Sequence, residues 1–427
     1  MAGSPTRIAL AALCLTTLPF TPQAAAQECG WTPIITSAPS ARHSAPLVYD
    51  SQREVIVTFG GLNTDAKGRG DPFGDTWEYD GQQWRQVATT GPSPRIGHAM
   101  VYDSVRRVTL LFGGSGLDGY QGDTWEWDGG EWRQVATTGP RPRGRHAMAF
   151  DSDRGVAVLF GGAPRGGDET WEWNGIEWTQ RIVAGPSERT RVAMAYDSAR
   201  HTTVLFGGRE PGGAALGDTW EWNGDEWTLV AESGATPRSR AVMVYDPRRG
   251  VCHLFGGTAG PYRRDTWEWN GAAWRLVADG GPPPRVYAGM AQHLGLNRTI
   301  LFGGWSGSDP LDDLWAWECE GGIALGVDAT CPAGGPIEVS WKGATPNGQI
   351  ALIYAARTGS FVIPPQYPCA GTPLGLSSSR IEPVFQGSAG GNGSRTLNAA
   401  AGPGACGGYL QLLDLSTCGT SNVARIE

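Results

Sequence analysis

Residues 108–129 read VTLLFGGSGLDGYQGDTWEWDG, and Trp132 follows shortly after them. The apolar run that ends in Phe-Gly-Gly occurs six times, with phenylalanine at positions 59, 112, 160, 206, 255 and 302. Each run is followed by an acidic residue and then by two aromatic residues two positions apart. These pairs are Trp77/Tyr79, Trp125/Trp127, Trp171/Trp173, Trp220/Trp222, Trp267/Trp269 and Trp315/Trp317.

Each repeat is predicted to contain four short β-strands joined by turns. In the second repeat they fall at residues 98–102, 108–112, 124–127 and 132–136, with Asp128-Gly129 as a hairpin turn. Alternate residues of a strand share a face, so both aromatic residues of each pair lie on one side. Such units cannot bury both faces alone. Six of them therefore predict an all-β fold, a six-bladed β-propeller.

The repeat resembles the kelch repeat, whose members form β-propellers. The resemblance rests on the Gly-Gly doublet after an apolar strand and on the downstream aromatic pair and tryptophan. It covers roughly residues 28–320. The sequence departs from the usual kelch pattern by carrying tryptophan where tyrosine is common in the third strand.

The N-terminus is predicted to close the ring. The sixth repeat has no fourth strand after Trp317, whereas Trp31 stands as far before Arg42 as Trp84 stands before Arg95. We therefore expect residues 31–35 to form the outer strand of the last blade. Cys29 and Cys319 lie two residues outside Trp31 and Trp317, which predicts a disulfide across this broken hairpin. The alternative is that both cysteines pair elsewhere.

The composition and the two ends of the chain suggest an exported protein. The net charge is −8 and the pI about 5.4, which argues against a nucleic-acid partner. Residues 1–26 match a signal peptide cleaved after Ala26, and no later apolar run is long enough for a transmembrane segment. We expect a monomer that is secreted or periplasmic, with the propeller at residues 27–320.

Residues 321–427 have a different composition and alternating strand patterns, which predict a small β-sandwich-like accessory domain. Its four cysteines leave three possible pairings, and Cys252 of the propeller is the expected free thiol. The four are Cys331, Cys369, Cys406 and Cys418.

No catalytic or metal-binding motif emerges from the sequence. The six histidines and eight cysteines form no zinc pattern, and phosphate-binding and nucleophile motifs are absent. We therefore expect no cofactor and no metal, and we name no catalytic residue. His253 replaces an apolar residue of the other repeats and is interpreted as a buried, hydrogen-bonded imidazole.

Two sets of arginines can be separated by comparing the repeats. One arginine per repeat precedes the first strand and one acid precedes the third, which predicts a structural ring of ion pairs. Two positions beyond each of these arginines the residue varies: Ser44, Gly97, Arg145, Arg191, Arg240 and Tyr287. Kelch adaptors of ubiquitin ligases use arginines in such loops to hold acidic peptides, and this resemblance implies the same for Arg145, Arg191 and Arg240. Aromatic residues of the neighbouring loops complete the candidate site: Tyr120, Tyr262, Tyr287 and Trp305.

The sequence thus favours a non-enzymatic binding module. Arginines would hold the carboxylates of an acidic peptide or protein, or of a glycan, and aromatic side chains would stack on the ligand. Three arginines on consecutive blades would lie along one arc, which suits an elongated ligand. One alternative is an enzyme that resembles the sialic acid mutarotases; another is a structural protein of the cell envelope.

Overall fold

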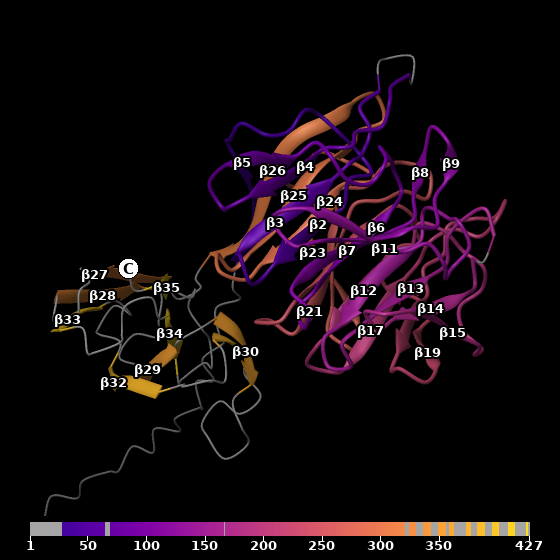
Figure 1. The fold of residues 1–427 in the computed structure, drawn as a ribbon. Helices are drawn as coiled ribbons and strands as arrows, with labels where there is room; N and C mark the ends of the chain where they lie inside the picture. The colour runs from indigo at the N-terminus through magenta and orange to yellow at the C-terminus, as the bar shows by residue number, and fades with distance from the viewer. Residues whose placement is uncertain are drawn as a thin grey trace, which may run out of the picture.

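The computed structural model describes residues 28–64, 69–165 and 167–320, together with short strands between residues 324 and 425. No helix occurs in these stretches, and so none that could cross a membrane. Residues 28–320 form a ring of six antiparallel four-stranded sheets, seen from one side in Figure 1. The all-β, six-bladed propeller expected from the repeats is confirmed.

Each of the first five blades consists of four consecutive main strands, from the central axis outward. Blade 1 contains β2 (Leu47–Asp50), β3 (Val55–Phe59), β4 (Thr76–Tyr79) and β5 (Trp84–Ala88). Blade 2 contains β6 (Ala99–Asp103), β7 (Val108–Phe112), β10 (Thr124–Trp127) and β11 (Trp132–Ala136), with a small hairpin of β8 (Ser115–Gly116) and β9 (Gly119–Tyr120). Blade 3 contains β12 (Ala147–Asp151), β13 (Val156–Phe160), β14 (Thr170–Trp173) and β15 (Trp178–Arg181). Blade 4 contains β16 (Ala193–Asp197), β17 (Thr202–Phe206), β18 (Thr219–Trp222) and β19 (Trp227–Ala231). Blade 5 contains β20 (Val242–Asp246), β21 (Val251–Phe255), β22 (Thr266–Trp269) and β23 (Trp274–Ala278).

Blade 6 is completed by the N-terminal strand. Its order is β24 (Gly289–His293), β25 (Arg298–Trp305), β26 (Pro310–Glu320) and β1 (Glu28–Ile34). Strand β1 pairs antiparallel with β26, so that Trp31 lies opposite Trp317. Cys29 lies opposite Cys319 in the same register, and the two are joined by a disulfide. Cys252 is free and buried.

Aromatic contacts repeat at every junction between blades. The tryptophan that opens each outer strand packs against the Phe-Gly-Gly phenylalanine of the preceding blade, with ring centroids 4.9–5.4 Å apart. Trp31 makes this contact with Phe255, so β1 replaces a missing outer strand in packing as well as in pairing. Buried aromatic area of this kind stabilises the stacking of otherwise independent sheets.

The ring of ion pairs predicted from the repeats is present in all six blades. Its members are Arg42–Asp75, Arg95–Asp123, Arg143–Glu169, Arg189–Asp218, Arg238–Asp265 and Arg285–Asp313. The arginines are at most 2% exposed, and each also donates to the carbonyl of the first glycine in Phe-Gly-Gly. We call these six residues the structural arginine ring.

Each arginine of this ring connects two blades. The main chain of Arg95 bonds to Phe73 and Gly61 of blade 1, whereas its guanidinium bonds to Asp123 and Gly113 of blade 2. The same division holds around the ring. Burial raises the pKa of Asp123, but the hydrogen bonds from Arg95 and Trp125 outweigh it and lower the pKa below its ordinary value.

The opposite face carries a second network of charged residues, which blade 6 lacks. In blades 1 to 4 a turn arginine bridges an aspartate and the glutamate of the third strand, as Arg106 does with Asp103 and Glu126. Blade 6 has His293, Leu296 and Ala316 at these three positions. Tyr79 of blade 1 packs in one apolar cluster with Ala316, whereas Trp127 at the matching position donates to Glu78. Apolar packing therefore replaces the charged network between blades 6 and 1.

His253 lies between blades 5 and 6 and is 1% exposed. Its Nδ1 is 3.1 Å from the Thr299 hydroxyl, and its Nε2 is 2.9 Å from a guanidinium nitrogen of Arg249. The Thr299 hydroxyl donates in turn to Gln292. These contacts account for a polar residue at an otherwise apolar position.

The C-terminal segment contains further antiparallel strands. One sheet contains β27 (Ala324–Ala329), β28 (Pro336–Lys342) and β33 (Arg395–Ala400). A second contains β32 (Glu382–Ser388), β29 (Gln349–Ala355), β34 (Tyr409–Asp414) and β35 (Ala424–Arg425), and a third pairs β30 (Thr358–Val362) with β31 (Pro373–Leu376). The domain boundary at residue 320 and the sandwich packing stay predictions. Residues 1–26 and the four cysteines of this segment lie outside the described residues.

Removing the disulfide should loosen the junction that it closes before the rest of the ring. In a Cys29→Ser/Cys319→Ser variant, strand β1 remains bound by its pairing with β26 and by the packing of Trp31 and Ile34, without a covalent link. We expect a loss of up to about 5 kcal/mol in the free energy of unfolding. Hydrogen–deuterium exchange should accelerate first in β1 and β26.

The matched control is Cys252→Ala, because blade 3 carries Ala157 at the equivalent buried position. Peptide mapping without reduction should recover the 29–319 linkage from wild type. Uniformly faster exchange across all blades, or two free thiols at positions 29 and 319, would contradict the closure described above.

Candidate functional site

A cavity of about 220 Å³ opens on the central axis, on the face that carries the structural arginine ring. Its wall consists of the residues that begin the innermost strands, mostly alanine, valine and methionine. Its lining includes three arginines and, within the part of the chain that the structure describes, no aspartate or glutamate. The cavity is therefore an electropositive opening above an apolar wall.

The mouth of the cavity is formed by one residue from each blade. These residues, which we call the mouth ring, are Ser44, Gly97, Arg145, Arg191, Arg240 and Tyr287. They are the variable positions singled out in the sequence. Each lies two residues beyond a member of the structural arginine ring, whose main-chain bonds anchor the segment. The repeat comparison therefore identified a continuous surface feature.

All six mouth-ring residues have a left-handed backbone conformation. Their φ angles lie between 58° and 63°, a region that glycine adopts without strain, as Gly97 does. For a residue with a Cβ, this conformation costs about 1–2 kcal/mol. Three arginines occupy it nonetheless. Strain that persists at the rim of a cavity is typical of functional positions.

The guanidinium groups of the three arginines are not neutralised by the protein. Arg145 is exposed and Arg191 and Arg240 are half-buried, and none of them makes an ion pair with a described carboxylate. The Nε–H groups of Arg191 and Arg240 are buried without a hydrogen-bond partner. Burial lowers the pKa of Arg191, and the charges of Arg145 and Arg240 lower it further while Tyr287 opposes them. An anion at this point would relieve the repulsion between the three cations.

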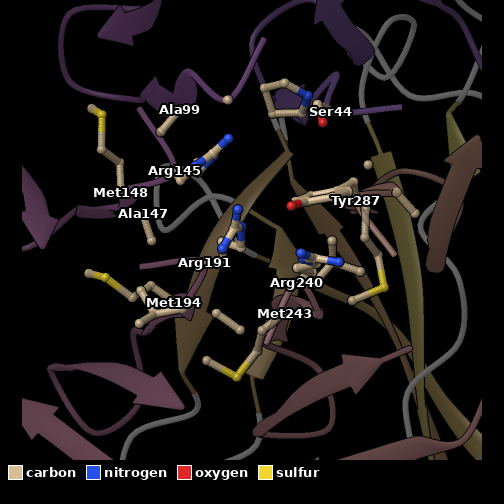
Figure 2. Close-up of a pocket in the computed structure, with 18 of the residues that line it drawn as sticks. Ser44, Ala99, Arg145, Ala147, Met148, Arg191, Met194, Arg240, Met243 and Tyr287 are labelled. Atoms are coloured by element: carbon tan, nitrogen blue, oxygen red, sulfur yellow. The ribbon is translucent and has the colours of Figure 1, made fainter. Parts of the chain in front are cut away.

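Figure 2 shows Arg145, Arg191, Arg240 and Tyr287 around the same open space, with nitrogen atoms of Arg191 and Arg240 and the oxygen of Tyr287 directed into it. The guanidinium carbon of Arg240 lies 5.1 Å from the centre of the Tyr287 ring, within the range of a cation–π contact. The sulfur atoms of Met148, Met194 and Met243 point away from this space.

The aromatic residues predicted for the site are only partly brought together. Tyr287 lines the cavity, whereas Trp305, Tyr120 and Tyr262 do not. Trp305 packs edge-on against His43, with ring centroids 5.6 Å apart, and the His43 ring lies 6.0 Å from that of Tyr287. This places an aromatic group on blades 6 and 1, beside the arginines of blades 3 to 5.

Tyr120 and Tyr262 lie further out. The ring of Tyr120 covers Gly144, the neighbour of Arg145, where a Cβ would lie 3.3 Å away. Tyr262 packs against Gly307 in the same manner, at 3.2 Å from the position of a Cβ. Both are close to the face that carries the mouth but apart from the cavity itself.

Two histidines line the cavity and were not predicted. His98 and His146 stand where the other blades carry Ala45, Val192, Ala241 and Ala288, and this irregularity was the available signal. They are 5% and 7% exposed, and their ring nitrogens lack hydrogen-bond partners among the described residues. Burial, and next the nearby Arg95 and Arg143, lower the pKa of His98 and that of His146 to about 3.

The comparisons with known proteins agree with the fold. Residues 25–175 match the model of the KLHDC2/KLHL20/DRC7 Kelch-repeats domain. This match covers the first part of the ring and supports a kelch-type repeat there, and the structure shows that residues 28–320 form a six-bladed β-propeller.

One similar solved structure is described as "Structure of YjhT". It is 14% identical, covers 65% of this chain and 95% of its own chain, and superposes with a TM-score of 0.50, which shows a shared fold alone. No curated protein matches the sequence.

Replacing Arg189 should destabilise the propeller. Arg189→Ala leaves Asp218 without its partner and removes the bond to the Gly207 carbonyl. Because breaking a buried ion pair costs about 3–5 kcal/mol and Asp218 is partly exposed, we expect a loss of about 3 kcal/mol in urea denaturation. An unchanged free energy of unfolding would show that the ring does not carry the stability assigned to it.

Acidification should destabilise the protein before any carboxylate titrates. The pKa of His98 and of His146 is about 3, and that of His293 about 4, all below the ordinary 6.5. The unfolded chain therefore binds protons that the folded state excludes, and stability falls as the pH drops below 6.5. Each histidine should contribute roughly 2 kcal/mol of this loss between pH 7 and pH 5.

The variant that tests this prediction is the double substitution His98→Ala/His146→Ala, because alanine occupies this position in three other blades. Its stability at pH 7 can differ from wild type, but its loss of stability between pH 7 and pH 5 should be smaller by about 4 kcal/mol, the sum of the two histidine contributions. Denaturant titrations at several pH values measure this dependence. An undiminished dependence would mean that these imidazoles titrate normally.

Proposed function

We propose that the propeller is a binding module that takes the carboxylate of an acidic peptide or glycan into the mouth of its central cavity. The observation that carries this proposal is the convergence of Arg145, Arg191 and Arg240 on one cavity whose described lining holds no acid. An arginine offers five donors in a planar fork that fits a carboxylate. Because the guanidinium groups of Arg191 and Arg240 are half-buried, a hydrogen bond from them to a carboxylate is stronger than the same bond on an open surface.

The geometry favours entry of an acidic group into the cavity over attachment along the rim. Arg191 and Arg240 direct nitrogen atoms into one space, and the charges of Arg145 and Arg240 both act on Arg191, so a single carboxylate there would interact with more than one cation. Tyr287 and the His43–Trp305 pair offer an adjoining aromatic surface for the rest of the ligand. An elongated ligand would then project outward over this face.

The enzymatic alternative has less support. A mutarotase-like reaction needs an effective general acid or base beside the bound sugar. The described cavity lining offers no carboxylate, and its two histidines are weak bases because their pKa is about 3. Sugar-anomerisation NMR with sialic acid separates the two functions, because binding without exchange of anomers supports the module and catalysed exchange supports the enzyme.

We also propose that the protein is exported, either secreted or periplasmic. The apolar N-terminal segment and the Ala24-Ala25-Ala26 sequence support a cleaved signal peptide. The Cys29–Cys319 disulfide adds support, because such bonds persist in oxidising compartments.

The binding proposal is tested by Arg191→Gly on an array of acidic peptides and acidic glycans. Glycine fits the φ of 58° without strain, so the free energy of unfolding should stay the same or rise. Because hydrogen bonds to charged groups contribute about 1.5–3 kcal/mol, affinity for the responding ligand should fall roughly tenfold or more.

Arg141→Ala serves as the matched control, because it removes one positive charge from an exposed loop of the same face outside the cavity. It should change affinity little beyond a salt-dependent effect. Equal losses of affinity in the two variants would mean that only general charge attraction binds the ligand. Unchanged affinity in Arg191→Gly would mean that the ligand binds elsewhere.

A further inference from the structure

The mouth ring is joined by backbone hydrogen bonds between neighbouring blades, except at one junction. The N–H of Arg145 donates to the carbonyl of Gly97, that of Arg191 to Arg145, and so on around to Ser44, which donates to Tyr287, with N···O distances of 2.7–3.2 Å. The remaining bond, from the Gly97 N–H to the Ser44 carbonyl, is not made. Within the described residues, neither of these two groups has another hydrogen-bond partner.

This open junction lies on the cavity. Ser44 and Gly97 both line it and are partly exposed. In ring order the junction stands across the mouth from Arg191 and Arg240. A ligand whose carboxylate contacts these arginines can therefore extend toward Ser44 and Gly97, where the side chains are the smallest of the mouth ring.

Among the described residues, the Gly97 N–H and the Ser44 carbonyl are an unpaired donor and an unpaired acceptor on neighbouring blades, so a group that both accepts and donates can satisfy them together. Buried or half-buried backbone groups are nearly always hydrogen-bonded, by protein, ligand or water. A trans secondary amide carries its carbonyl and its N–H on opposite edges, so it can bridge two such groups as an inserted strand does. A hydroxyl group can also donate and accept a hydrogen bond, but water does the same, so a hydroxyl would gain little by replacing water there.

Resting on the function proposed above, we infer that the junction between Ser44 and Gly97 is a subsite for a backbone amide, and that the ligand is an acidic peptide. The Gly97 N–H donates to an amide carbonyl of the peptide, and the peptide N–H donates to the Ser44 carbonyl. A peptide places an amide within a few bonds of every acidic side chain, whereas an acidic sugar has one only when it is N-acylated.

The decisive probe is a short peptide with blocked ends and a central glutamate, compared with two versions in which an ester replaces the amide on either side of the glutamate. The ester lacks the N–H. One of the two esters should bind about tenfold more weakly, as expected for one lost hydrogen bond to a partner left unsatisfied. The binding of the other should change little.

The protein-side variant is Gly97→Arg. Arginine occupies the same left-handed conformation in three other blades, with φ of 58–63°, so the fold should tolerate it. Its side chain covers the open junction and adds a fourth cation. Affinity for the amide peptide and for both esters should therefore become nearly equal, and binding of the carboxylate should persist.

Hydrogen–deuterium exchange supplies an independent readout. In the free protein the Gly97 amide should exchange quickly, whereas the amides of Arg191 and Arg240, which are bonded to neighbouring blades, should exchange slowly. The amide peptide should slow exchange at Gly97, and the weak-binding ester should do so only in proportion to its occupancy.

The outcomes are distinguishable. Equal affinity of wild type for the amide and both esters overturns the amide subsite and leaves the carboxylate site standing. A second comparison uses N-acetylneuraminic acid and its analogue with a hydroxyl in place of the acetamido group. If the protein discriminates between these two sugars but not between the amide peptide and its esters, the subsite belongs to a sugar and the peptide proposal is overturned. Failure of Arg191→Gly to weaken any of these probes overturns the proposed function itself.

Discussion

The propeller depends on the ion pair that each structural arginine makes across a blade junction. Its main chain is bonded to one blade and its guanidinium to the next, so six such residues connect the whole ring. Because the guanidinium groups are almost completely buried, each requires its acid and its glycine carbonyl. The geometry of the loop face follows from this constraint.

Because the structural arginines hold the main chain in place, the side chain two residues further on can vary without loss of the fold. Two residues beyond each structural arginine, the chain is held in one conformation by main-chain bonds that do not depend on the side chain. Serine, glycine, arginine and tyrosine can all stand there. A fixed backbone with a variable side chain is how a repeated scaffold presents a specific surface, and three of the six positions present an unpaired cation to one cavity.

Much of this was predictable because the repeats supply their own comparison. The six copies of Phe-Gly-Gly and of the aromatic pair determine the strands and the blade count, and the offsets of Trp31 and Cys29 predict the closure. The sequence could not show that Arg145, Arg191 and Arg240 adopt left-handed backbone conformations, because nothing in an arginine marks such a position. His98 and His146 were overlooked although they break the pattern. The missing hydrogen bond between Ser44 and Gly97 concerns two neighbouring blades, and no local sequence pattern encodes it.

The central claim is that the two sets of arginines have different roles, and NMR of the arginine Nε–H groups tests it most directly. The Nε–H of every structural arginine donates to a carbonyl two residues earlier at 2.9–3.1 Å, whereas those of Arg191 and Arg240 have no partner. Signals assigned by single substitution should be followed during titration with an acidic peptide. The signals of Arg191 and Arg240 should shift and exchange more slowly with solvent, while the six structural signals stay in place. Movement of the structural signals with those of Arg191 and Arg240 unmoved would contradict this division of roles.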